Sequence, residues 1–325
     1  MKISVGIDIG GTNTAFGIVD KQKNILYKSS IPTGAQDGPE SFIERLSSAI
    51  SGIIEKEFNS YTLDGVGIAA PGANNVTGTL ESAANIKWGK INLPAELGKI
   101  FGVPTAIMND ANAAALGEKY FGVAKGMKNF VVLTLGTGLG SGIVIDGHVI
   151  YGENGFAGEY GHIIMQPGGR LCGCGRKGCL EAYTSASGIC KTAAELLKNS
   201  DENSQLRSIP FEEFSTKKLY DLAVAGDVIA GRAFDEAGKI LGLAIANITI
   251  TLDPEAVILA GGVMKAGDLL MKPVAKYFDE NYLALCSNKT KILKSNFTEG
   301  EGAFLGASCL VDEEMQIKQS NIASV

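Results

Sequence analysis

Two segments of the chain share a pattern of apolar runs interrupted by glycine-rich turns. Apolar residues dominate residues 3–9 and 15–19, and they dominate again over 130–135 and 142–146. Short runs rich in Ile and Val that flank a glycine-rich turn predict two strands joined as a β-hairpin. The two predicted turns are Gly10-Gly11-Thr12-Asn13 and Gly136-Thr137-Gly138-Leu139-Gly140.

The two predicted hairpins also resemble each other residue by residue. Ile7-Asp8-Ile9-Gly10 aligns with Leu133-Thr134-Leu135-Gly136, and residues 17–20 align with residues 142–146 after a small gap. An internal repeat at this separation indicates two similar domains, each of which opens with a glycine hairpin.

Helical and extended patterns alternate along the rest of the chain. Apolar residues at helical spacing predict helices over 40–58, 111–121, 184–198 and 216–250, and Asp253-Pro254 ends the last of them. Apolar runs predict strands at 63–69, 104–108 and 256–260, and the polar residues 199–210 predict an exposed loop. This alternation predicts an α/β fold.

The composition, the net charge and the distribution of apolar residues argue against several classes of protein. The chain has 325 residues, 42 of them glycine, and a net charge of −6. An acidic chain without a basic run lacks the electrostatic footprint of a general nucleic-acid binder. Asp8 interrupts the apolar N-terminus, which argues against a signal peptide, and residues 241–252 are too few to cross a membrane. We therefore expect a cytoplasmic protein with no membrane partner, whose six cysteines are not disulfide-bonded.

The glycine turns are candidates for binding a nucleotide. Phosphate groups need backbone N–H donors at close range, which glycine-rich turns provide. Asp8 could hold a water of Mg²⁺, and Thr12, Thr134 and Thr137 could donate hydroxyl hydrogen bonds to phosphate. A single turn of this kind is more simply a β-hairpin turn, but two related turns favour phosphate binding. The chain has no Gly-Lys-Ser/Thr element of the Walker type.

Two further motifs have both a structural and a functional interpretation. Gly261-Gly262 follows a predicted strand and is either a simple strand-to-helix turn or a place where a planar ring approaches the backbone. Asn109-Asp110 follows a predicted strand, at the sheet edge where α/β proteins bind ligands. A carboxylate there could accept the proton of a sugar hydroxyl, although either residue could equally serve as a helix N-cap.

The densest cluster of metal-binding residue types lies between residues 159 and 181. It contains Glu159-Tyr160-Gly161-His162 and then Cys172-Gly173-Cys174, with Cys179 and Glu181 following. One His and three Cys suit a closed tetrahedral Zn²⁺ site. Chance clustering is the alternative, and the spacing differs from that of a DNA-binding zinc finger.

Together these motifs resemble the ROK family of sugar kinases, and in particular the bacterial glucokinases of that family. The resemblance implies an α/β fold of two domains, the actin-like ATPase fold, with a cleft between the domains. We predict a smaller N-terminal domain over 1–117, to which a helix at about 308–325 returns, and a larger domain over 118–307 that carries the zinc-binding loop. It also implies ATP, Mg²⁺ and a structural Zn²⁺, and a homo-oligomer, either a dimer or a tetramer.

The resemblance assigns roles to individual residues. Asp110 would be the catalytic base. The sugar would be bound by Gly72, Asn85, Asn109, Asp110, Glu159, His162 and Glu181. ATP and Mg²⁺ would be bound by Asp8, Gly10, Gly11, Thr12, Asn13, Thr134, Gly136, Thr137, Gly138, Gly261 and Gly262. Zinc would be bound by His162, Cys172, Cys174 and Cys179, so that one imidazole nitrogen of His162 meets zinc and the other faces the sugar.

The predicted function is the ATP-dependent phosphorylation of glucose. Other sugars remain alternatives, namely N-acetylmannosamine, N-acetylglucosamine, allose and fructose. Some relatives are sugar-responsive transcription regulators, but because the first phosphate hairpin begins at Ile3 we expect no DNA-binding domain before it. A non-catalytic sugar sensor would not need Asp110 or both phosphate turns. The sequence leaves open whether polyphosphate could replace ATP.

Overall fold

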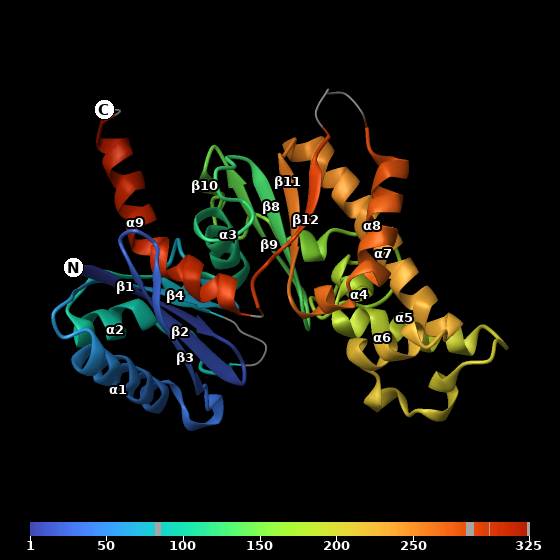
Figure 1. Ribbon diagram of the computed structural model, residues 1–325, viewed down its shortest axis with the longest axis horizontal. Helices are drawn as coiled ribbons and strands as arrows, with labels where there is room; N and C mark the ends of the chain where they lie inside the picture. The colour runs from blue at the N-terminus through green and yellow to red at the C-terminus, as the bar shows by residue number, and fades with distance from the viewer. Residues whose placement is uncertain (82–85, 284–288, 299, 324–325) are drawn as a thin grey trace. The chain divides into compact units, whose positions relative to one another are not determined.

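The computed structural model describes residues 1–81, 86–283, 289–298 and 300–323 (Figure 1). The chain packs into two compact units that are interleaved along the sequence. The first comprises Met1–Met127, Gly142–Gly158 and Asn296–Val325, and the second comprises Lys128–Ser141 and Glu159–Ser295.

The first five-stranded sheet has the strand order β3-β2-β1-β4-β7. Its strands are β1 (Lys2–Ile9), β2 (Asn13–Asp20), β3 (Ile25–Pro32), β4 (Thr62–Ala70) and β7 (Thr105–Asn109). β1 pairs antiparallel with β2 and parallel with β4. Ile3, Val5 and Ile7 alternate along β1 and are fully buried in a core that includes Phe42 and Leu46 of α1. The period of two therefore directs one face of β1 into this core.

Helices cover both faces of this sheet (Figure 1). They are α1 (Pro39–Glu57), α2 (Leu93–Phe101), α3 (Asp110–Tyr120) and α9 (Glu301–Ala323). α9 contacts β1 and β4 on the face opposite α1. A Cβ atom at Gly6 or Gly67 would lie 1.8 Å from the Phe304 carbonyl oxygen or 1.7 Å from that of Ala307, respectively. Only glycine at these two positions lets the α9 backbone approach the sheet so closely.

The second five-stranded sheet has the order β10-β9-β8-β11-β12. Its strands are β8 (Phe130–Leu135), β9 (Leu139–Ile145), β10 (His148–Val149), β11 (Ala256–Ala260) and β12 (Lys291–Lys294). In both sheets the third, second, first, fourth and fifth strands in chain order lie side by side. The shared order confirms the internal repeat predicted from the two hairpins, and the mixture of layers confirms the α/β prediction.

The helices between β10 and β12 divide segments that the sequence pattern predicts as continuous. They are α4 (Glu181–Thr184), α5 (Ala186–Lys198), α6 (Thr216–Val224), α7 (Val228–Leu252) and α8 (Asp268–Asn281). The prediction of one helix over 216–250 is wrong, because Gly226 has φ +94° and Asp227 caps a new helix. Ser185 likewise divides the predicted helix at 184–198 by capping α5 through the Gly188 N–H. Asp253 ends α7 in a left-handed conformation, as the Asp-Pro pair predicts.

The remaining regular elements are short. The two-stranded sheet pairs β5 (Ala73–Asn74) with β6 (Thr79–Leu80). Short 3₁₀ helices lie at Ala35–Asp37, Tyr160–His162, Gln205–Ser208, Phe211–Glu213 and Gly262–Ala266. Among the described residues, no helix combines the length and the apolar character that crossing a bilayer requires.

Candidate functional site

The first glycine turn, in the first unit, connects β1 to β2. The Gly10 N–H donates to the Asn13 carbonyl oxygen at 3.0 Å, which closes the turn, while Gly11, Thr12 and Asn13 are exposed. Buried Thr33, directly after β3, braces the turn: its hydroxyl donates to the Gly10 carbonyl oxygen at 2.7 Å, and its N–H donates to the Thr12 carbonyl oxygen at 2.8 Å. Thr33 thus fixes the shape of the turn, while residues 11–13 stay exposed, where a ligand could reach them.

Asn109 and Asp110 lie where β7 ends and α3 begins. The Asn109 carboxamide oxygen accepts the Ala111 N–H at 2.9 Å, so Asn109 is the N-cap of α3. Asp110 is the first residue of the helix, where the helix dipole favours a negative charge. The Asp110 carboxylate accepts the same Ala111 N–H at 3.0 Å, so Asp110 supplies a carboxylate in the first turn of α3 and also helps Asn109 to satisfy the helix end.

Asp8 and Asp110 are close enough to influence each other's charge, although they are far apart in sequence. Burial raises the pKa of Asp8 to about 8, and the negative charge of Asp110 acts in the same direction. Two neighbouring carboxylates offer the hard oxygen ligands that Mg²⁺ prefers. A cation bound there would relieve the repulsion between them, so the residues present fit a magnesium ion.

Gly72 forms the turn that follows β4. It has φ +69°, which favours glycine, and its carbonyl oxygen accepts the Glu81 N–H at 3.1 Å. Asn85, which the sequence also predicts at the sugar pocket, lies outside the described residues.

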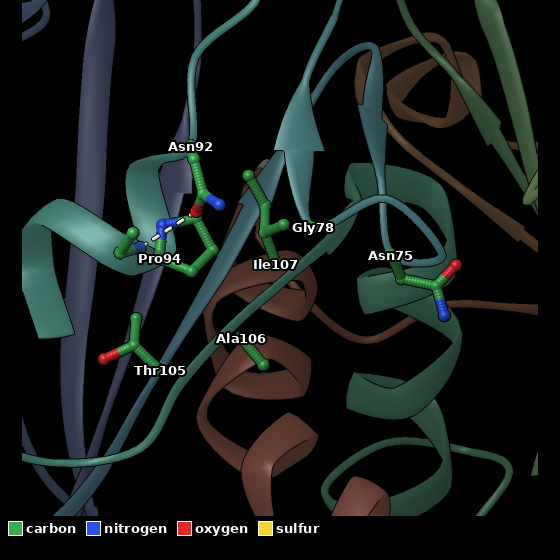
Figure 2. Close-up of a pocket in the computed structure, with 8 residues that line it drawn as sticks. Asn75, Gly78, Asn92, Pro94, Thr105, Ala106 and Ile107 are labelled. Carbon is green, nitrogen blue, oxygen red and sulfur yellow. Dashed lines mark hydrogen bonds between the residues drawn. The ribbon is translucent and has the colours of Figure 1, made fainter.

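A polar hollow of about 330 Å³ lies beside the two-stranded sheet and the start of α2. Figure 2 shows residues that line this hollow, with Ile107 of β7 drawn between Asn92 and Asn75, and Thr105 of the same strand below Asn92. Asn92 uses its side chain to cap α2 by accepting the Ala95 N–H at 2.9 Å. Asp8 and Asp110 do not line the hollow, so it is separate from the predicted catalytic residues.

The second glycine turn, in the second unit, connects β8 to β9. The Gly136 N–H donates to the Gly138 carbonyl oxygen, and the Ala186 N–H donates to the Gly136 carbonyl oxygen, each at 2.9 Å. Thr137 is exposed at the tip of the turn. Gly261 follows β11, and a Cβ atom there would lie 2.4 Å from the Leu135 carbonyl oxygen. The structure thus brings the predicted residues of the second turn and the Gly261-Gly262 pair together.

Hydrogen bonds connect two segments that carry predicted sugar-binding residues of the second unit to β9. Glu159 precedes a 3₁₀ helix, and its carbonyl oxygen accepts the His162 N–H at 2.9 Å, while the Tyr160 N–H donates to the Ser141 hydroxyl. Glu181 begins α4, and its carboxylate accepts the Leu139 N–H at 2.9 Å. Leu139 is the first residue of β9, so Glu181 directly contacts the second glycine turn.

His162 and three cysteines form a compact cluster. All four candidate ligand atoms of His162, Cys172, Cys174 and Cys179 lie within 4.8 Å of one another. The Cys174 and Cys179 sulfurs are 3.6 Å apart, and the Cys172 sulfur is 3.6 Å from His162 Nδ1. Two sulfurs at the corners of a tetrahedron with Zn–S bonds of ~2.3 Å would be about 3.8 Å apart. The donor set and its spacing therefore fit a zinc ion.

The cluster also contains one thiol that ionises readily. The Arg176 backbone N–H, with help from the guanidinium of the same residue, lowers the pKa of Cys174 to about 6. Burial instead raises the pKa of Cys172 to about 12 and raises that of Cys179. A metal ion would compensate for the cost of the buried thiolates, because coordination deprotonates the thiol.

Arg170 fastens the loop that carries Cys172, Cys174 and Cys179 to α4 and α5, and no sequence pattern predicted this role. Its guanidinium donates two hydrogen bonds to the Glu195 carboxylate, at 2.8 and 2.6 Å. It also donates to the carbonyl oxygens of Ala182 and Gly188, each at 3.1 Å, and stacks on the Tyr183 ring at 4.6 Å. A lone arginine in a loop carries no local signal of this role, since its partners lie on α4 and α5.

Comparisons with known proteins agree with this geometry. A family model described as ROK family matches residues 4–314. The chain belongs to the ROK family. The predicted resemblance is thereby confirmed, and so is the actin-like ATPase fold that it implies.

ROK relatives of known activity match nearly the whole chain. A glucokinase from Halalkalibacterium halodurans is 35% identical over 98% of this chain and 97% of its own length. A glucokinase from Thermotoga maritima is 34% identical over 96% of this chain and 98% of its own. A Bacillus subtilis xylose repressor is 28% identical, and the match covers 95% of this chain but 77% of the repressor.

Solved ROK structures show the same fold. The ROK glucokinase from Streptomyces griseus, in complex with glucose and AMPPNP, has a TM-score of 0.78 and 32% identity, over 95% of this chain and 98% of that one. A ROK hexokinase from Thermus thermophilus has a TM-score of 0.79 and 29% identity, over 98% and 99% of the two chains.

Proposed function

We propose that this ROK protein is a glucokinase that transfers the γ-phosphoryl group of ATP to glucose, giving glucose 6-phosphate. The observation that carries the proposal is the position of Asp110 at the amino end of α3, within electrostatic reach of Asp8 beside the first glycine turn. A kinase needs a proton acceptor for the attacking hydroxyl and a cation site for the phosphate charge. The glucokinase relatives that match almost end to end support the same activity.

Each residue would contribute to one part of the reaction. Asp110 would accept the proton of the sugar hydroxyl as its oxygen attacks phosphorus. Exposed Thr12 and Thr137, one in each glycine turn, would donate hydroxyl hydrogen bonds to phosphate oxygens. Asp8 would help to hold Mg²⁺, which would partly neutralise the charge of the phosphate groups. Most of the rate enhancement would come from positioning and charge stabilisation, with the base as a further factor.

The sugar would be oriented by the polar groups that the resemblance assigns to it. These are the predicted contributors Gly72, Asn85, Asn109, Asp110, Glu159, His162 and Glu181. His162 would coordinate a structural zinc ion through Nδ1, the nitrogen that lies 3.6 Å from the Cys172 sulfur. Its other nitrogen would then face a sugar hydroxyl, in a tautomer fixed by the metal.

The test is an assay of ADP release with Mg²⁺-ATP and a panel of sugars. Glucose is expected to give the highest kcat/KM, ahead of N-acetylmannosamine, N-acetylglucosamine, allose and fructose. Release of ADP no faster than the sugar-free rate with every sugar would refute the proposal. Specific retardation of DNA in a gel shift, without any sugar-dependent ADP release, would instead support a regulator like the xylose repressors.

Asp110→Asn is the matched variant for this assay, because it keeps the size of the side chain and removes the base. Loss of a general base lowers kcat by about 10²–10⁴-fold. The glucose dissociation constant should change by much less, since an amide can still hydrogen-bond a hydroxyl. A kcat within a few-fold of the wild-type value would contradict the assignment of the base.

We also propose a cytoplasmic role in glycolysis and a homo-oligomeric state for the protein. Both follow from the resemblance to bacterial glucokinases. Light scattering coupled to gel filtration would test the oligomeric state, and a purely monomeric elution at micromolar concentration would count against it.

A further inference from the structure

The Glu181 carboxylate lies between the second glycine turn and the cysteine cluster. One of its oxygens, Oε2, accepts the Leu139 N–H at 2.9 Å, and the other, Oε1, lies 3.5 Å from the Cys172 sulfur. The proposed function places the same carboxylate on a sugar hydroxyl, and the present inference rests on that assignment. An ionised carboxylate accepts about four hydrogen bonds, so these contacts can coexist.

The segment that begins with Glu181 is tied to the turn at a second point. The Ala186 N–H, at the start of α5, donates to the Gly136 carbonyl oxygen at 2.9 Å. Two hydrogen bonds, one from Glu181 at the start of α4 and one from Ala186 at the start of α5, therefore connect this segment to the turn. A shift of the turn would move the Glu181 carboxylate, and a shift of the carboxylate would move the turn.

From these contacts we propose that Glu181 couples sugar binding to nucleotide binding by joining the sugar site to the second phosphate turn. A bound sugar would hold Glu181 in the position from which it accepts the Leu139 N–H, and this hydrogen bond would stabilise the conformation of the turn. A nucleotide that orders the turn would in the same way position Glu181 for the sugar. The two effects are equal by thermodynamic linkage, so each ligand strengthens the binding of the other by one factor.

Gly138 provides a way to test this link from the nucleotide side. A Cβ atom at Gly138 would lie 2.5 Å from Glu181 Oε2 and 3.4 Å from its carboxyl carbon. The obstructed group is the end of a flexible side chain, so Gly138→Ala displaces the carboxylate without requiring the backbone to move. Gly231, on α7, has open space around its Cβ position and takes no part in the proposed site. Gly231→Ala is therefore the control.

The experiment measures glucose binding by calorimetry in the absence of any nucleotide. Gly138→Ala should weaken glucose binding about tenfold, because it displaces a charged hydrogen-bond partner of the sugar. Gly231→Ala should leave the glucose dissociation constant within about twofold of the wild-type value, because it leaves that hydrogen bond in place. Equal glucose affinity in the two variants, both folded by circular dichroism, would overturn the coupling.

A second variant tests the coupling itself. In the wild type, saturation with AMPPNP should tighten glucose binding, by a factor within the ~5–150-fold range typical of coupled sites. Glu181→Asp keeps the charge and shortens the side chain, so this factor should fall toward one. An unchanged factor would overturn the inference. Wild-type protein that binds no glucose at all would instead refute the proposed function, and the two failures are thus distinguishable.

Discussion

Replacement of Asp8 by asparagine should stabilise the ligand-free protein, increasingly so as the pH rises. Burial and the nearby Asp110 carboxylate raise the pKa of Asp8 from 3.8 to about 8. Between these two pH values the folded protein holds a proton that the unfolded chain has released. The stabilisation that comes with the protonated carboxyl is therefore complete below about pH 4 and is lost as the pH rises through 8. The carboxamide of the Asp8→Asn variant cannot ionise, so the variant avoids this loss.

The size of the effect follows from the pKa difference. Within the window each pH unit changes the free energy of unfolding of the wild type, relative to Asp8→Asn, by at most ~1.4 kcal/mol. Between pH 5 and pH 7 this amounts to an upper limit of about 3 kcal/mol, which corresponds to several degrees in Tm. The variant should nevertheless lose activity, because Asp8 is the proposed ligand for the Mg²⁺ hydration shell.

Differential scanning calorimetry at pH 5, 6, 7 and 8, without nucleotide or Mg²⁺, measures this difference. Asp64→Asn is the control, because hydrogen bonds from Lys2 and Lys21, at 2.7 and 2.5 Å, lower the pKa of Asp64. Asp64 is ionised in both the folded and the unfolded state over this range, so its effect on Tm should not vary with pH. A Tm difference for Asp8→Asn that stays constant from pH 5 to pH 8 would refute the burial argument.

Two further predictions concern the loop that carries Arg170 and the three clustered cysteines. Cys172→Ala should reduce the zinc content measured by mass spectrometry and should weaken glucose binding by releasing His162. The control variant Cys190→Ala should leave the zinc content unchanged. Full zinc occupancy in Cys172→Ala would exclude this cysteine as a ligand. Arg170→Lys should lower the free energy of unfolding in urea by about 2–3 kcal/mol, because lysine cannot replace the fork of charged hydrogen bonds. Arg232 forms an exposed ion pair with Glu202, so Arg232→Lys should change the free energy of unfolding by less than ~1 kcal/mol. Equal effects of the two substitutions would contradict the role given to Arg170.

Features that depend on neighbouring residues could be predicted from the sequence. The alternation of Ile3, Val5 and Ile7 directs one face of β1 into the core, and a strand's period of two needs no tertiary information. The repeat of the glycine hairpin indicated that the chain contains two similar parts, and the strand order that the two sheets share agrees with this repeat. The spacing of His162 and its cysteines predicted their cluster, because a glycine-rich loop of that length can fold back on itself. Helix ends were predicted less well, since Ser185 and Gly226 interrupt segments whose apolar spacing continues.

Only the tertiary structure decided which distant residues meet. Asp8 lies on β1 and Asp110 directly follows β7, with β4 between the two strands, and this strand order is what places both carboxylates near the first turn. The contact of Glu181 with the Leu139 N–H depends on how α4 packs beside β9. A sequence pattern records which face of an element is apolar, but many partners can cover that face equally well. The choice among them is made by the packing of the whole sheet and its helices, and it is this choice that turns separate motifs into a site.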